Sequence, residues 1–234
     1  MEFLALIDWS IVIQIIIIDL LLGGDNALII ALACRNLHPD QRKKGIIYGT
    51  AGAIILRVVL VAFAVTLLQI PFLKLVGAIL LIWIGYKLIA QQDENQHTLQ
   101  GPNQLFAAIK TIIVADIVMS LDNVLAIAGA AGQVSNPSHQ VGYVIFGLVV
   151  SVPIIIAGSK MVLFLIDRFP FIVTAGAGLL GWIAGGMIVT DPALIKYFGE
   201  GIANYEITAE IIAAIIVMGS GEFVKRRHKK ANAA

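Results

Sequence analysis

The sequence predicts an all-α polytopic membrane protein with seven transmembrane helices. Of its 234 residues, 59% are hydrophobic and only 13% are charged, a composition that excludes an ordinary soluble domain. Apolar windows of about 20 residues, long enough for a helix to cross a hydrocarbon core of ~30 Å, recur along the whole chain. We expect spans near residues 9–33, 46–68, 71–90, 105–131, 141–164, 171–189 and 207–223.

The first span is expected to remain in the protein rather than to be cleaved as a secretory signal. Its leading residues include Glu2 and Asp8, where a signal peptide would have Lys or Arg. The single cysteine, Cys34, excludes an internal disulfide framework and a Cys-rich metal site. The four histidines fall in predicted loops or in the tail, which argues against a catalytic zinc site built on histidine.

Lys and Arg gather at the connections that follow the first, third and fifth spans, which the positive-inside rule assigns to the cytoplasm. Seven crossings then place the N-terminus outside the cell and the C-terminus in the cytoplasm. We expect the membrane to be the cell membrane, in a bacterium the inner membrane. Residues 224–234 form a basic cytoplasmic tail, interpreted as an anchor on anionic lipid because it has no interleaved aromatics for nucleic acid. The basic residues of these connections are Arg35, Arg42, Lys43, Lys44, Lys87, Lys160 and Arg168.

One acidic motif occurs twice inside apolar spans. A carboxylate within hydrocarbon costs several kcal/mol, so four carboxylates at matched spacing mark the functional site by default. The first span contains Asp19 with Asp25 and Asn26, and the fourth span contains Asp116 with Asp122 and Asn123.

The duplication extends beyond the acidic motif. At a nearly constant offset of 97 to 99 residues, the neighbourhood of Pro71 and Trp83 matches that of Pro170 and Trp182. We therefore expect one transmembrane domain over residues 1–234, with a first three-helix repeat at 9–90 and a second at 105–189. Because three spans reverse the direction of the second copy, the repeats must be inverted, which places ion sites near the midplane. The seventh helix, at 207–223, is an addition to the two repeats.

Convergence of the four carboxylates requires an interrupted helix. Residues six apart on a regular helix point about 120° away from each other and differ in height by about 9 Å. Gly23, Gly24 and Ser120 are candidates for such a break and for backbone carbonyl ligands. The alternative, that these small residues serve close packing between helices, stays open beside it.

The oxygen atoms of the Asp and Asn side chains suit magnesium, calcium or manganese. Met119 lies between Asp116 and Asp122, and a thioether ligand would favour manganese or iron. Arg57, at the centre of the second span, must pair with an acid. It either gates the site by releasing a carboxylate when metal enters, or forms a permanent ion pair, and the sequence leaves both readings open.

The motifs Gly23-Gly24-Asp25-Asn26 and Ser120-Leu121-Asp122-Asn123 closely resemble those of the TerC family of integral membrane proteins. The resemblance covers about residues 3 to 225. It implies membership of a group of small inverted-repeat exporters that includes lysine exporters, and a role in divalent metal homeostasis, chiefly manganese efflux. The metal-site residues that it carries over are Asp19, Asp25, Asn26, Asp116, Asp122 and Asn123.

We therefore expect a non-enzymatic transporter that exports manganese(II) from the cytosol by alternating access, in exchange for protons. Manganese is the transported substrate, and no cofactor is expected. The expected partners are a divalent metal ion and the lipid bilayer but no nucleic acid, and a homo-oligomer stays open. Two other hypotheses are a non-transporting assembly or metal-delivery factor for secreted proteins and, more remotely, an intramembrane aspartyl protease, whose Gly-x-Gly-Asp pattern the sequence lacks.

Overall fold

The computed structural model describes residues 8–67, 70–90, 102–134 and 137–231, and throughout these ranges the secondary structure is helical, without strands. The side chains of residues 225–234, expected to form the basic tail, lie outside the described part, as does Glu2. The helices are α2 (Trp9–Leu22), α3 (Gly24–Cys34), α4 (Pro39–Ala62), α5 (Ala64–Leu67), α6 (Leu73–Ala90), α7 (Pro102–Ala131), α8 (Pro137–Arg168), α9 (Phe171–Val189), α10 (Pro192–Phe198), the 3-10 helix η2 (Glu200–Tyr205) and α11 (Glu206–Ala231).

Six of the described helices are long and apolar enough to cross a membrane, and α2 with α3 adds a seventh crossing if the two count as one span. Each of the seven apolar windows expected from the sequence contains one of these helices, but the second window, 46–68, is interrupted at Phe63, where α4 ends and the short α5 follows. Several helices continue past the predicted limits, because hydropathy marks the stretch that crosses hydrocarbon whereas the helix continues into the interface. Helix α11 in particular extends to Ala231, so the backbone of residues 224–231 is helical.

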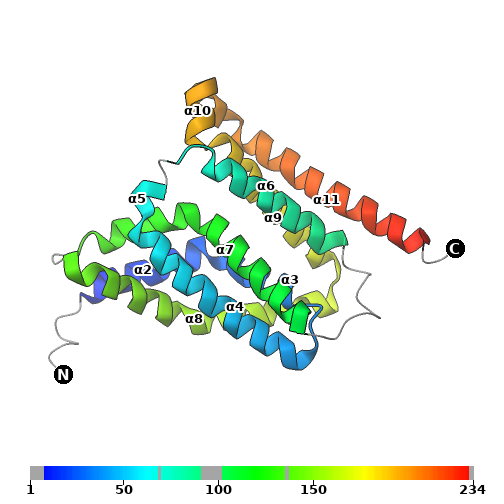
Figure 1. Ribbon diagram of the computed structural model, residues 1–234, viewed down its shortest axis with the longest axis horizontal. Helices are drawn as coiled ribbons and strands as arrows, with labels where there is room; N and C mark the ends of the chain where they lie inside the picture. Colours follow the sequence, from blue (N-terminus) through cyan, green and yellow to red (C-terminus); the bar gives the residue numbers. More distant parts are fainter. Residues whose placement is uncertain (1–7, 68–69, 91–101, 135–136, 232–234) are drawn as a thin grey trace.

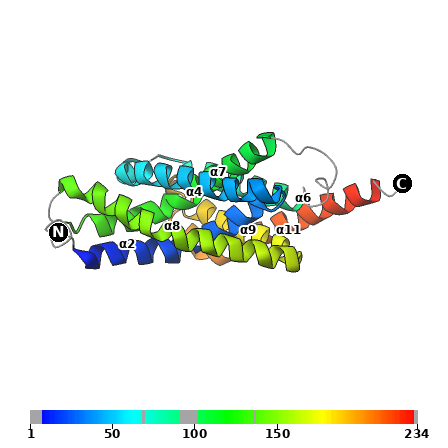
Figure 2. The same cartoon turned by 90° about the horizontal axis from the view of Figure 1, so that it is seen from below.

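The helices form two groups that lie side by side (Figure 1). Helices α6, α9 and α11 pack closely together as one group, while α2, α3, α4, α7 and α8 form the other. Figure 2 shows the molecule from below as a flattened body, with α2 and α8 next to each other along one side. The main hydrophobic core includes buried residues of both groups, among them Leu32, Leu81, Ile112 and Leu180, and it joins the two groups.

Glycines permit the close approach of α9 and α11. A Cβ on Gly181 would lie 2.7 Å from the carbonyl oxygen of Ala213, and one on Gly185 would lie 2.4 Å from that of Ala209. In lipid, where apolar side chains gain little by leaving the solvent, small residues of this kind allow van der Waals contact between helix backbones. Gly185 therefore determines how closely α11 packs on α9.

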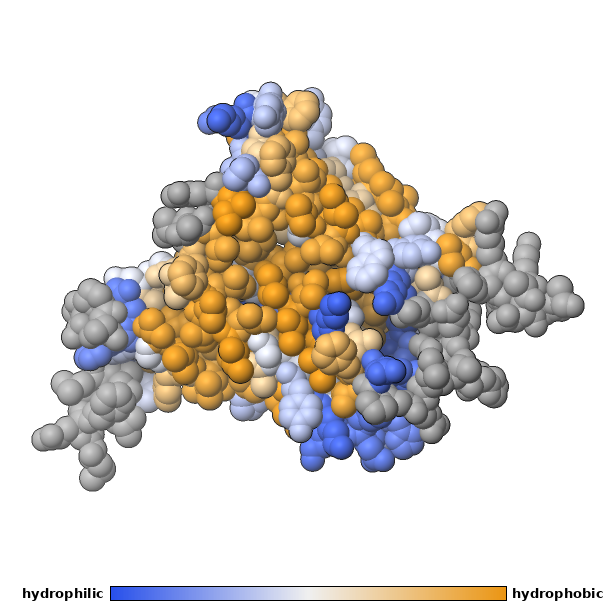
Figure 3. Space-filling model, viewed as in Figure 1, coloured by the Kyte–Doolittle hydropathy of each residue, from blue (hydrophilic) through white to orange (hydrophobic). Residues whose placement is uncertain are grey.

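The outer surface has the polarity expected of a protein in a bilayer. Large apolar side chains such as Ile55, Phe106, Met161 and Ile207 are exposed, whereas charged residues are sparse along the middle of the spans. Figure 3 shows a broad hydrophobic area on the visible face, with hydrophilic residues concentrated toward the margins of the molecule. The protein is thus a multi-pass integral membrane protein whose exposed apolar side chains face lipid.

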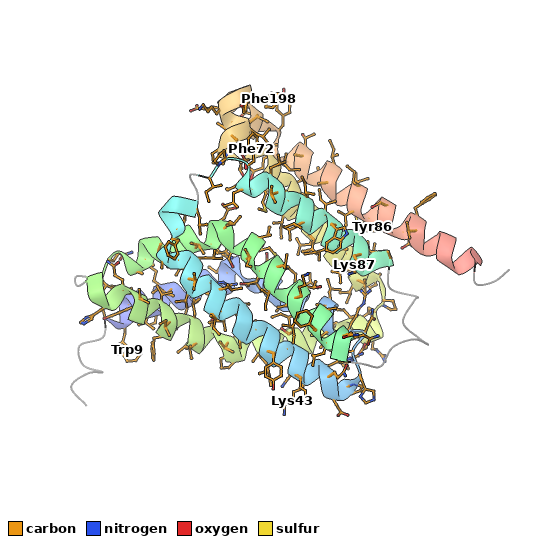
Figure 4. All side chains as sticks on the ribbon, viewed as in Figure 1. Trp9, Lys43, Phe72, Tyr86, Lys87 and Phe198 are labelled. Carbon is orange, nitrogen blue, oxygen red and sulfur yellow. The ribbon has the colours of Figure 1, made fainter. Side chains whose placement is uncertain are left out.

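A buried carboxylate accepts hydrogen bonds from two helices at the tip of the molecule where α6, α9 and α10 meet. Asp191 is fully buried, and it accepts hydrogen bonds from Ala193 and Leu194 at the start of α10 and from Phe72 and Leu75 at the start of α6. Its side chain therefore caps two helix starts at once, satisfying amides that have no partner within their own helices. Phe72 lies close to this tip, below Phe198 (Figure 4).

Candidate metal site at the break of the first span

The first span is interrupted at Gly23, where α2 ends and α3 begins with a bend of 51°. The amide of Gly23 donates to the carbonyl oxygen of Asp19 at 2.8 Å, and the carbonyl oxygen of Gly23 accepts from the amide of Asn26 at 3.0 Å. A Cβ on Gly23 would lie only 2.5 Å from the Asp19 carbonyl oxygen, whereas a Cβ on Gly24 would meet nothing within 4 Å. The tight junction therefore requires glycine at position 23 and not at position 24.

The second copy of the motif is not interrupted. Helix α7 continues from Pro102 to Ala131 and passes through Ser120 without a break. Ser120 instead contributes its hydroxyl group, which accepts from Nε of Arg57 at 3.1 Å and donates to Asp116 at 3.3 Å. The two copies thus differ in local structure, since two adjacent glycines weaken a helix where Ser and Leu do not.

Arg57 of α4 binds one acid from each copy of the motif. Its guanidinium group forms hydrogen-bonded ion pairs with Asp19 of α2 and with Asp116 of α7. The exposed fractions of Arg57, Asp19 and Asp116 are 2%, 1% and 5%. Ser151 of α8 donates a further hydrogen bond to Asp19. Four helices therefore meet at one buried group of charges, which has a formal charge of −1.

Polar atoms without partners lie next to these charges. Oδ1 of Asp25, both side-chain polar atoms of Asn26 and Oγ1 of Thr50 are buried and have no hydrogen-bond partner within the described residues. Asn26, Thr50, Arg57 and Asp116 line one small cavity of about 20 Å³, together with apolar side chains. A cavity of this size accommodates about one water-sized particle. A buried polar atom left unsatisfied costs about 1–3 kcal/mol, so these atoms favour an added ligand.

The remaining motif residues lie on the other side of the break. Asp122 is exposed over 55% of its side chain and forms an ion pair of 2.6 Å with Lys74 of α6. Nδ2 of Asn123 donates at 3.0 Å to the carbonyl oxygen of Leu22, the last residue of α2. Asn123 thus satisfies a carbonyl that the break leaves without a partner within its helix. Met119 is buried in the main hydrophobic core.

The four carboxylates do not form a single cluster. Within the ranges that the structure describes, no group of three or more His, Cys, Asp or Glu residues is placed so that it could hold a metal ion. The physical reason is that cations already bind three of the four acids: Arg57 binds Asp19 and Asp116, and Lys74 binds Asp122. For several of these carboxylates to bind one metal ion together, at least one of the ion pairs must therefore open.

Sequence reasoning missed three polar residues of this region, Thr50, Lys74 and Ser151. Ser151 had a detectable signal, since it is a polar residue near the middle of the otherwise apolar stretch that forms α8. Lys74 had another, since it lies at the start of α6, the opposite end from the basic Lys87. The position of Thr50 beside Asn26 depends on how α4 packs against α3 and carries no local signal.

Comparison with known proteins agrees with this architecture. The chain is 40% identical to the uncharacterized membrane protein YjbE of Bacillus subtilis over 91% of its own length and 95% of that protein. It is 25% identical to the uncharacterized membrane protein YceF of the same organism, over 90% of this chain and 79% of YceF, and 26% identical to the UPF0053 protein YegH of Escherichia coli, over 70% and 34%. No solved structure matches. The model of the family described as integral membrane protein TerC matches residues 4–229, which confirms the resemblance seen in the two motifs. The chain belongs to the TerC family of integral membrane proteins.

Proposed function

We propose that this protein is a transporter that exports a divalent metal ion, manganese(II), from the cytosol. The site of transport is the region around the break in the first span, with Asp19, Asp25 and Asn26 from one copy of the motif and Asp116 and Asn123 from the other. Asp122 lies at the opposite side of the break and provides a further carboxylate on the exit path. The metal is the substrate of this protein and not a resident cofactor.

The observation that carries the proposal is the combination of buried charge and unsatisfied oxygen atoms at one helix break. Asp19, Asp25 and Asp116 with Arg57 have a formal charge of −2, and Oδ1 of Asp25 and Oδ1 of Asn26 have no partner in the described residues. A divalent cation neutralises that charge and also supplies the missing partner. Carboxylate and amide oxygens are ligands that manganese, magnesium and calcium accept.

The break supplies a second favourable element. Helix α2 ends at the site, with Gly23 as its C-cap, and the C-terminus of a helix carries a partial negative charge that favours cations. The cavity lined by Asn26 and Thr50 lies near the middle of α4, and within it Thr50 is nearer than Arg57 to the Pro39 end, which carries the basic residues Arg42 and Lys43. If the basic end is cytoplasmic, a cytosolic cation meets Asp25 and Asn26 first.

Alternating access follows from the inverted-repeat hypothesis. In that arrangement the repeats at 9–90 and 105–189 exchange conformations, and the uninterrupted α7 and the broken α2–α3 pair represent the two forms of one unit. We infer that metal entry displaces Arg57 from one of its two carboxylates, and that Arg57 closes the empty site again after release. Protons compete with the metal for the same oxygen atoms. We expect this competition to couple metal export to proton exchange.

Manganese is proposed over calcium and magnesium because Met119, next to Ser120 and three residues after Asp116, is available as a soft ligand if α7 rearranges. Peptide-bond hydrolysis is not proposed. Arg57 binds both Asp19 and Asp116, whereas an aspartyl protease requires its two carboxylates to share one proton.

The proposal is tested by metal uptake into inside-out proteoliposomes at fixed pH, with manganese(II), calcium and magnesium compared. We expect saturable manganese accumulation that is lost in Asp25→Asn and in Asp122→Asn. Asp40→Asn serves as the matched control, because the Asp40 side chain is 89% exposed and pairs with His38 at the surface. Absence of flux with every metal, from folded protein, would transfer support to the assembly or metal-delivery hypothesis, in which a secreted partner protein would mature poorly without this protein.

A further inference from the structure

A second cavity lies away from the acidic motif, where the C-terminal ends of α3 and α6 meet the N-terminal part of α7. Its volume is about 230 Å³, and Arg35, Asn36, Trp83, Lys87 and Thr111 are among the residues that line it. At about 30 Å³ for each water molecule in the liquid, this volume corresponds to roughly eight water molecules. The cavity is therefore large enough for a tetrahedral oxyanion with part of its substituent.

Arg35 gives this cavity a buried positive charge. The residue is 5% exposed, and its Nη2 donates to the carbonyl oxygen of Leu88 at the end of α6. Its Nε donates to Oδ1 of Asn36 at 3.4 Å, while Nη1 is buried and has no hydrogen-bond partner among the described residues. Burial lowers the pKa of Arg35 to about 10, so the guanidinium still carries its charge at neutral pH. A buried cation with an unused donor favours an anionic ligand.

Lys87 adds a second positive charge to the same cavity. Its ammonium group lies 5.1 Å from the centre of the Trp83 ring, and the Trp83 side chain is half-exposed. Tryptophan and lysine at the end of a transmembrane helix mark the level of the lipid headgroups. Figure 4 shows Lys87 beside Tyr86 near the end of α6. No carboxylate is among the described residues that line the cavity, so none of those residues balances the charges of Arg35 and Lys87.

We propose that this cavity binds a phosphate group, held by the guanidinium of Arg35 and the ammonium of Lys87 at the headgroup level of the membrane. The phosphate chemistry fits the planar donor set of Arg35, in which Nη2 is held on Leu88 and the buried Nη1 has no partner among the described residues. An anionic phospholipid headgroup and a free phosphate in solution both provide this group. Basic pockets between transmembrane helices on the cytoplasmic side are suited to headgroups of anionic lipids.

The test measures binding to the purified full-length protein in neutral detergent micelles. One arm titrates phosphatidylglycerol, with phosphatidylcholine as the neutral comparison, and follows bound lipid by native mass spectrometry. The other arm titrates inorganic phosphate and follows the fluorescence of a variant in which Trp83 is the one remaining tryptophan, because Trp83 lines the cavity. Saturable binding in either arm supports the phosphate site, and the arm that responds identifies the source of the phosphate.

Three variants make the result specific. Arg35→Gln retains a donor for the Leu88 carbonyl oxygen but loses the charge, and we expect affinity to fall by roughly tenfold or more. Lys87→Gln removes a partly exposed charge, and it keeps the test informative if Arg35→Gln fails to fold. We expect its affinity to fall by about threefold to tenfold. Lys160→Gln is the matched control, since Lys160 is an exposed lysine of α8 that is not among the residues lining the cavity, and should bind as the wild type does.

Several outcomes would overturn the proposal. They are no saturable binding in either arm, equal binding of the neutral lipid, or equal losses in Lys160→Gln and Lys87→Gln, which would indicate attraction by bulk charge alone. Asp93 and Glu94 lie in the part of the chain outside the described residues, so the variant Asp93→Asn with Glu94→Gln is assayed in parallel. Binding that appears in that variant alone would mean that the chain's own acids prevent phosphate binding, and would also contradict the proposal.

Discussion

Replacing Arg57 by methionine should strongly destabilise the protein, and the size of the effect follows from the buried charges around it. The guanidinium is the ion-pair partner of both Asp19 and Asp116, and the exposed fractions of the three residues are 5% or less. Its removal leaves the two carboxylates with hydrogen bonds from the hydroxyl groups of Ser120 and Ser151, which carry no compensating charge.

Removing one partner of a buried ion pair costs about 3–5 kcal/mol, because the other charge remains buried without compensation. For Arg57→Met this corresponds to a change of about two to four powers of ten in the unfolding equilibrium constant. Replacing the whole group by neutral residues of similar volume is often close to neutral. The triple variant Arg57→Met, Asp19→Asn, Asp116→Asn should therefore recover most of the lost free energy of unfolding.

The assay is unfolding by SDS titration in mixed micelles without added metal, with helicity measured by circular dichroism. The control is Lys74→Gln, which breaks the ion pair with Asp122. Because the Asp122 side chain is 55% exposed, the loss of this pair should cost less than about 1 kcal/mol. If Arg57→Met and Lys74→Gln unfold alike, or if the triple variant is no more stable than Arg57→Met, then the ion pairs of Arg57 with Asp19 and Asp116 do not stabilise the fold.

Three further substitutions test the packing around the site and between the helix groups, each by the same unfolding assay. Gly23→Ala should cost about 1–3 kcal/mol, because its Cβ would lie 2.5 Å from a backbone oxygen of α2, while Gly24→Ala, with open space around its Cβ, should be nearly neutral; equal costs would contradict the tight junction. Gly185→Ala should also cost about 1–3 kcal/mol by pushing α11 away from α9, against a matched Gly129→Ala in open space, and a stable Gly185→Ala would show that the helices can separate freely. Asn123→Ala should cost about 1 kcal/mol, since the last carbonyl oxygen of α2 loses its donor, and an unchanged stability would mean that this bond contributes nothing.

The spans were predictable from sequence because each rests on a local property, the length of an apolar run. The acidic residues were also predictable as candidate site residues from a local property, because a carboxylate within an apolar span is rare and energetically costly. The short helix α10 and the 3-10 helix η2 were not expected, because seven and six residues are too short to give a periodic signal.

The partners of the charged residues could not be read from the sequence. Arg57 was expected to pair with an acid, but its partners could not be identified. Asp19 and Asp116 lie 38 and 59 residues away from it in the sequence, and the packing of α2, α4 and α7 brings the three residues together. The pairing of Lys74 with Asp122 likewise depends on the position of α6 beside α7. The inverted relation of the two repeats and the identity of the metal remain predictions of this account.

The central claim is that the oxygen atoms at the break of the first span bind a divalent cation, and equilibrium binding of manganese(II) tests it most directly. Free manganese gives an electron paramagnetic resonance signal in solution that is lost on binding. We predict one saturable site per chain in the purified wild type, absent in Asp25→Asn and retained in Asp40→Asn. An undiminished signal with folded wild-type protein, or equal binding by Asp25→Asn, would contradict the claim.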